Sequence, residues 1–101
     1  MDAIADPALT AELTLQPVHR YGVDAAILYS DIVVPVNAIG FGVDVQPGVG
    51  PTVEQPFVQE SDLRRLRPLE PEVDTPYVLD AVRILTNESP VPVIGFAGAP
   101  F

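Results

Sequence analysis

One acidic residue, Asp31, stands near the end of a long apolar stretch and is the residue of this sequence best placed to do chemistry. Residues 25–35 read Ala-Ala-Ile-Leu-Tyr-Ser-Asp-Ile-Val-Val-Pro, in which Asp31 is the single charged side chain. Burying a lone carboxylate costs free energy unless a partner compensates its charge. Such an aspartate therefore needs an explanation, and a catalytic role supplies one. We therefore take Asp31 as the candidate catalytic residue; the alternative is an aspartate that only caps a helix or loop.

The other groups of polar residues favour structural roles. His19 is the only histidine and is expected on the surface of a helix. The arginine-rich stretch 64–67 could bind a polyanion, but acidic residues flank it, as is typical of a short solvated helix. Glu70, Glu72 and Asp74 are too loosely arranged, with a proline between them, to predict a metal site.

The elements that must position Asp31 are a helix and the strand that follows it. An Asp-Pro start and a glycine end predict a helix over residues 7–21. Pro17 removes one backbone donor, so it should kink or end the regular ladder of hydrogen bonds. Residues 23–29 are apolar almost throughout, which indicates a parallel strand covered on both faces. Asp31 marks the junction between this strand and a loop.

A hairpin and a linker are predicted in the middle of the chain. Residues 37–58 are rich in glycine and proline and otherwise loop-like. Within them, valines alternate with polar residues before a Pro-Gly pair, which indicates a short β-hairpin over one end of the main sheet. Residues 61–66 read as a short capped helix, and three prolines then predict a stiff linker over residues 68–76.

A second helix and a second strand complete the pattern. A Thr-Pro pair at 75–76 begins the helix, and its apolar residues recur at intervals of three and four, which predicts one buried face. That face consists of Val78, Ala81, Val82 and Leu85. Residues 91–97 form a second strand of the buried type.

The order helix, strand, hairpin, helix, strand predicts an α/β fold with a parallel sheet. Two parallel strands cannot close a barrel, and a (β/α)₈ TIM barrel takes about 250 residues. We expect residues 1–101 to form the N-terminal portion of such a barrel, with the first two strand-helix units and an inserted β-hairpin. The barrel domain is therefore expected to be incomplete and truncated at both ends.

Composition limits the classes of partner. The chain has 14 acidic and 5 basic residues, for a formal net charge of -9, which argues against nucleic acid or an anionic membrane as a partner. There is no cysteine, so no disulfide or thiolate metal site lies within it. The acidic first residues do not resemble a signal peptide, and we expect a cytoplasmic protein. A hydrophobic content of 48% is high for so short a chain and suggests surfaces that face absent neighbours.

Three segments, taken in order, resemble uroporphyrinogen decarboxylase of haem and chlorophyll biosynthesis. They are Thr-Leu-Gln-Pro-Val-His-Arg-Tyr-Gly-Val-Asp-Ala-Ala-Ile at 14–27, Tyr-Ser-Asp-Ile-Val-Val-Pro at 29–35 and Gly-Phe-Ala-Gly-Ala-Pro-Phe at 95–101. The Pro-Gly-Val-Gly-Pro stretch at 47–51 matches the family's hairpin between them. Each motif alone is modest evidence, but the ordered set spans essentially the whole chain.

The resemblance implies a homodimeric (β/α)₈ barrel that removes carbon dioxide from four acetate side chains of uroporphyrinogen without a cofactor, giving coproporphyrinogen. In that reaction a fixed carboxylate binds the pyrrole nitrogens and stabilises the cation formed when the ring is protonated on carbon. Asp31 matches the family's aspartate in this role. Ile27 matches an apolar pocket position, and Phe96 is expected to be another wall residue of the substrate site.

The family's pattern also includes groups that fall outside residues 1–101. An arginine-bearing loop that binds substrate carboxylates would precede Met1, and a tyrosine, a serine and a histidine would follow Phe101. We therefore expect the isolated chain to be inactive. Two alternatives remain, a cobalamin-linked methyltransferase of the same barrel superfamily, which uses zinc, and a truncated relic without catalysis.

Overall fold

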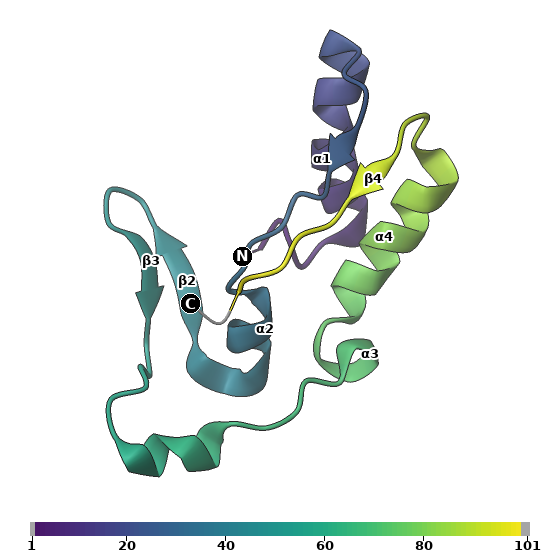
Figure 1. Cartoon of the computed structure of the whole chain (residues 1–101). Coiled ribbons are helices and arrows are strands. Elements are labelled where there is room, and N and C mark those ends of the chain that lie inside the picture. Colours follow the sequence, from purple (N-terminus) through teal and green to yellow (C-terminus); the bar gives the residue numbers. More distant parts are fainter. Residues whose placement is uncertain (1, 100–101) are drawn as a thin grey trace.

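The chain folds into a helix-and-sheet part that holds the core and a hairpin part beside it (Figure 1). The structure is a computed structural model and describes residues 2–99. Its elements in chain order are α1 (Pro7–Tyr21), β1 (Ala26–Ile27), α2 (Val34–Val36), the π-helical turn η1 (Asn37–Phe41), β2 (Val43–Gln46), β3 (Gly50–Val53), the 3-10 helix η2 (Glu60–Arg65), α3 (Pro71–Asp74), α4 (Pro76–Glu88) and β4 (Val93–Ile94).

Helix α1 begins and ends where its capping residues predict. The Asp6 carboxylate accepts a hydrogen bond from the Leu9 N–H at 3.1 Å, which satisfies one donor of the first turn. Gly22 takes a left-handed conformation, with φ of 63°, and donates its N–H to the Val18 carbonyl. Pro17 lies inside the helix, which continues through it to Tyr21 rather than ending there.

Strands β1 and β4 pair in parallel, as predicted, but both are shorter than the apolar runs that contain them. Ala26 lies opposite Val93 and Ile27 opposite Ile94. Two backbone bonds join these segments, from the Ala26 N–H to the Pro92 carbonyl and from the Leu28 N–H to the Ile94 carbonyl. Among the described residues, β1 and β4 pair only with each other. Because backbone hydrogen bonds to a neighbour define a strand, each strand is limited to the residues that pair.

The core lies on one face of this strand pair, between α1 and α4 (Figure 1). Side chains of β1 and of the two residues after it alternate: Ala26 and Leu28 are buried, whereas Ile27 is 64% exposed and Tyr29 is 46% exposed. The described elements cover this one face, and the cover that the sequence predicts for the other face stays a prediction. The buried cluster comprises Ala11, Leu15, Val18, Ala26, Leu28 and Leu85.

Helix α4 presents much of the predicted apolar face to this core. Ala81 and Leu85 are fully buried, and Val78 packs against the cluster. Val82 differs from the prediction because it is 36% exposed, and Ile84 packs against the core in its place. Compared with the prediction, the buried face of α4 is thus rotated toward the side of the helix that meets α1.

The hairpin part confirms the predicted β-hairpin and adds helical turns that the sequence did not indicate. Strands β2 and β3 pair antiparallel, with a turn at residues 47–49 between them. The predicted short helix is present as the 3-10 helix η2, closed by a capping box between Gln59 and Asp62. Helices α2 and α3 fall in stretches predicted as loop and linker, because proline near the start of each favours a first helical turn.

Within residues 2–99, no helix is both long enough and apolar enough to cross a membrane.

Candidate active site

Asp31 lies just beyond the carboxyl end of β1, beside a hollow of about 460 Å³. The carboxyl end of β4 reaches the same hollow, because the two strands run in parallel. Among its described lining residues, Asp31 is the one with an ionisable side chain, and the others are apolar or glycine. The lining residues are Asp31, Ile32, Val33, Pro35, Val36, Phe96, Ala97, Gly98 and Ala99.

The Asp31 carboxylate also organises the turn that follows the strand. Its Oδ1 accepts a hydrogen bond from the Val33 N–H at 3.0 Å, and its backbone carbonyl accepts one from the Val34 N–H at 3.2 Å. An asparagine could accept the same bond through its amide oxygen, so this turn does not require a charge. The side chain is half-buried rather than fully buried, since it projects past the strand.

The structure brings two of the three predicted site residues together. Phe96 lines the hollow with Asp31, although it is 47% exposed. Ile27 does not line the hollow; its side chain is exposed on the uncovered face of β1, where its pairing partner Ile94 is also 48% exposed. Ile27 and Ile94 are therefore neighbouring exposed side chains on this face.

Thr14, which the sequence did not identify as a site residue, fixes the backbone just before Asp31. Its Oγ1 accepts a hydrogen bond from the Tyr29 N–H at 2.9 Å and donates one to the Thr10 carbonyl at 2.8 Å. Thr14 and Thr10 are almost fully buried on α1. The four-residue spacing of the two threonines was the available signal, but the contact of Thr14 with Tyr29 follows only from the tertiary packing.

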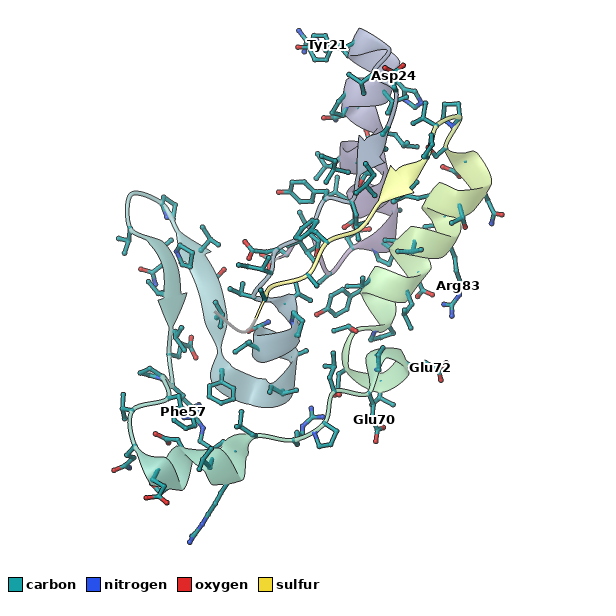
Figure 2. The ribbon with its side chains drawn as sticks, viewed as in Figure 1. Tyr21, Asp24, Phe57, Glu70, Glu72 and Arg83 are labelled. Carbon is teal, nitrogen blue, oxygen red and sulfur yellow. The ribbon has the colours of Figure 1, made fainter. Side chains whose placement is uncertain are left out.

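The other polar groups that the sequence singles out do not line the hollow. His19 is exposed on α1. The Arg67 guanidinium donates two 2.8 Å bonds to the Asp74 carboxylate, and these bonds, with the Glu70 N–H, lower the pKa of Asp74 to about 2. Glu70 and Glu72 point in different directions at α3 (Figure 2). Within the described part of the chain, no group of three or more acidic, histidine or cysteine side chains could hold a metal ion.

Curated proteins of one family match this chain along its full length. The uroporphyrinogen decarboxylases of Streptomyces griseus and Thermobifida fusca are 56% and 54% identical to it over 102 residues, covering 100% of the chain. That of Bacillus pumilus is 53% identical over 96 residues. The chain spans about 28% of the length of the curated relatives it matches.

A solved structure and a family model agree with this result. A methyltransferase from Methanosarcina mazei shares the fold with a TM-score of 0.76 and 25% sequence identity, over 98% of this chain and 31% of that one. The chain is thus a portion of a TIM-barrel α/β fold. The model of the family "Uroporphyrinogen decarboxylase (URO-D)" matches residues 1–101. The chain therefore belongs to the uroporphyrinogen decarboxylase family.

Proposed function

We propose that this sequence forms part of an enzyme that decarboxylates the acetate side chains of uroporphyrinogen to give coproporphyrinogen, in porphyrin and haem biosynthesis, without a cofactor. The observation that carries the proposal is the position of Asp31: one carboxylate beside an apolar hollow, in a chain more than half identical to enzymes of this name. A homodimer in the cytoplasm, free of nucleic acid and membrane, belongs to the same proposal.

The chemistry needs a fixed negative charge. Protonation of a pyrrole on carbon makes the ring a cation, and the carbon–carbon bond of the acetate then breaks with its electron pair moving into the ring. Carbon dioxide leaves, a proton adds to the exocyclic carbon to form the methyl group, and the ring carbon loses its extra proton. A carboxylate near the pyrrole nitrogens accepts their hydrogen bonds and stabilises the cationic state.

The surroundings of Asp31 support this role. The apolar lining of the hollow lowers the local dielectric, so a carboxylate attracts a developing cation more strongly there than in water. Phe96 supplies one wall beside Asp31, and Ile27 would contact the substrate along the uncovered face of β1. The substrate's own carboxylates would have to meet cationic groups outside this hollow.

The test is direct conversion of substrate. A protein of the relatives' full length that carries this sequence should convert uroporphyrinogen to coproporphyrinogen, with four carbon dioxide molecules released per macrocycle, as measured by chromatography of the oxidised products. Residues 1–101 alone should show no turnover, because two paired strands cannot enclose the substrate. Failure of the full-length protein to release carbon dioxide would refute the proposal.

A second candidate is a cobalamin-linked methyltransferase, favoured by the fold shared with the Methanosarcina mazei protein. That protein is 25% identical to this chain, whereas the named decarboxylases reach 56%, so decarboxylation is the better supported activity. Zinc analysis of the full-length protein separates the two. Stoichiometric zinc together with absent decarboxylation would favour the methyltransferase.

A further inference from the structure

The backbone that carries Asp31 is held at both ends by side-chain hydrogen bonds. On one side, the Tyr29 N–H donates to Thr14 Oγ1 at 2.9 Å. On the other, the Val33 N–H donates to Asp31 Oδ1 at 3.0 Å. Asp31 lies between these two fixed amides, so its position depends on both bonds.

The Thr14 bond lies at the point where the strand ladder stops. The N–H groups of Ala26, in β1, and of Leu28, just after β1, donate to the carbonyls of Pro92 and Ile94. Donors alternate in direction along a strand, so the Tyr29 N–H points away from β4. The Thr14 hydroxyl therefore accepts a donor that β4 cannot reach, and it ties the end of the strand to α1.

The hydroxyl of Thr14 is itself held in place. It donates to the Thr10 carbonyl, and the Thr10 hydroxyl donates to the Ala3 carbonyl at 2.8 Å. Thr14 is 3% exposed and Thr10 is 2% exposed. Its donor and one of its acceptor lone pairs are used, and the residue is almost fully buried, so these two bonds restrict the orientation of the Thr14 hydroxyl.

We propose that Thr14 is a positioning residue for the reaction, acting through the Tyr29 amide to set where the Asp31 carboxylate stands beside the hollow. This inference rests on the proposed decarboxylase function. Thr14 does not line the hollow, so it acts on the substrate only through Asp31. Displacement of a reacting group by about 1 Å can cost on the order of 100-fold in rate.

The experiment compares two buried hydroxyls on the same helix face. In the full-length protein, Thr14→Val removes the bond to Tyr29, whereas Thr10→Val removes a buried hydroxyl that does not touch the strand. We expect Thr14→Val to lower kcat by about 10- to 100-fold with a smaller change in KM, since a misplaced Asp31 weakens mainly the transition state. The kcat of Thr10→Val should stay within about threefold of the parent value. Thr14→Ser should keep most of the parent activity because it keeps the hydroxyl.

Two further measurements separate positioning from stability. On an Asp31→Asn background, Thr14→Val should lower kcat by about twofold or less, because the effects of two residues that act through one group are not additive. Amide exchange at Val33 should be faster in Thr14→Val than in Thr10→Val, and this readout does not depend on activity.

Three results would overturn the inference. The first is an equal loss of kcat in Thr14→Val and Thr10→Val. The second is a loss of kcat from Thr14→Val that is as large on the Asp31→Asn background as in the parent protein. The third is loss of the fold in both Thr14→Val and Thr14→Ala. A parent protein without decarboxylation would instead refute the proposed function, and the exchange at Val33 would still report whether Thr14 positions this loop.

Discussion

Asp31 makes a structural bond, and the proposed function gives it a chemical role as well; its two oxygens allow both. One oxygen closes the turn with Val33. The structure gives the other no hydrogen-bond partner among residues 2–99, which leaves it available for a donor from the substrate. The bond of one oxygen to the Val33 N–H fits the alternative of a loop aspartate, and it does not exclude catalysis by the other oxygen.

A second residue-scale consequence concerns Asp74 and acid. Its pKa is lowered from 3.8 to about 2 by Arg67 and the Glu70 N–H. A carboxylate with a lowered pKa in the folded state stabilises that state above its ordinary pKa, and the contribution disappears as the pH falls through the folded value. We therefore expect stability to decline between about pH 4 and pH 2 partly through this pair.

The variant Asp74→Asn should flatten that decline, as measured by urea unfolding of the full-length protein at several pH values. Asp80→Asn is the matched control, because the Asp80–Arg83 pair lies exposed on α4 and is screened by solvent. An acid profile that is the same in Asp74→Asn and in the parent would contradict the expectation.

At the scale of elements, the sequence predicts what local chemistry determines. The bounds of α1 follow from its caps, Asp6 and Gly22, and the β-hairpin follows from alternating valines around a Pro-Gly pair. Both signals act within a few residues of where they appear, so no knowledge of the tertiary structure is needed.

Features set by neighbouring elements were not predictable in the same way. The apolar run 23–29 contains a strand of two residues only, because hydrogen-bonded pairing with β4 and not hydrophobicity defines its length. The contact of Thr14 with Tyr29 joins residues fifteen positions apart, a separation at which a single sequence shows no pattern. At the site, the sequence indicates Asp31, Ile27 and Phe96, of which Asp31 and Phe96 line the hollow. The hydrogen bond from Tyr29 to Thr14 is seen only in the fold.

The rotated buried face of α4 gives a prediction at this scale. Leu85 is fully buried, whereas Val82 is 36% exposed although both belong to the apolar pattern. Leu85→Ala should lower the free energy of unfolding by about 2–5 kcal/mol through lost burial and a residual cavity. Val82→Ala should cost about 1 kcal/mol or less. Denaturant unfolding of the full-length protein measures both, and equal effects would show that the helix is oriented differently.

At the scale of the whole molecule, the chain is extended for its length. Its radius of gyration is 15.3 Å, against about 13 Å for a compact domain of 100 residues. Its principal extents are 48 × 32 × 24 Å. The uncovered face of β1 and β4 exposes Ile27, Tyr29, Ile94 and Phe96. Exposed apolar surfaces of this kind drive association.

We expect purified residues 1–101 to self-associate through that face. Ile27→Thr combined with Ile94→Thr should raise the monomer fraction, measured by light scattering at matched concentrations, because the change removes apolar surface from both strands. Val73→Thr is the control, since Val73 is 71% exposed on α3, outside the strand pair. A parent chain that is monomeric and folds cooperatively would contradict this expectation.

The account depends most on the charge of Asp31, and one comparison tests it directly. In the full-length protein, Asp31→Asn keeps an acceptor for the Val33 N–H but removes the negative charge, whereas Asp31→Ala removes both. The account predicts that Asp31→Asn slows carbon dioxide release from uroporphyrinogen by about 100-fold or more, close to the loss in Asp31→Ala. If Asp31→Asn instead released carbon dioxide within a few-fold of the parent rate while Asp31→Ala did not, Asp31 would serve the turn alone and the proposed catalytic role would be wrong.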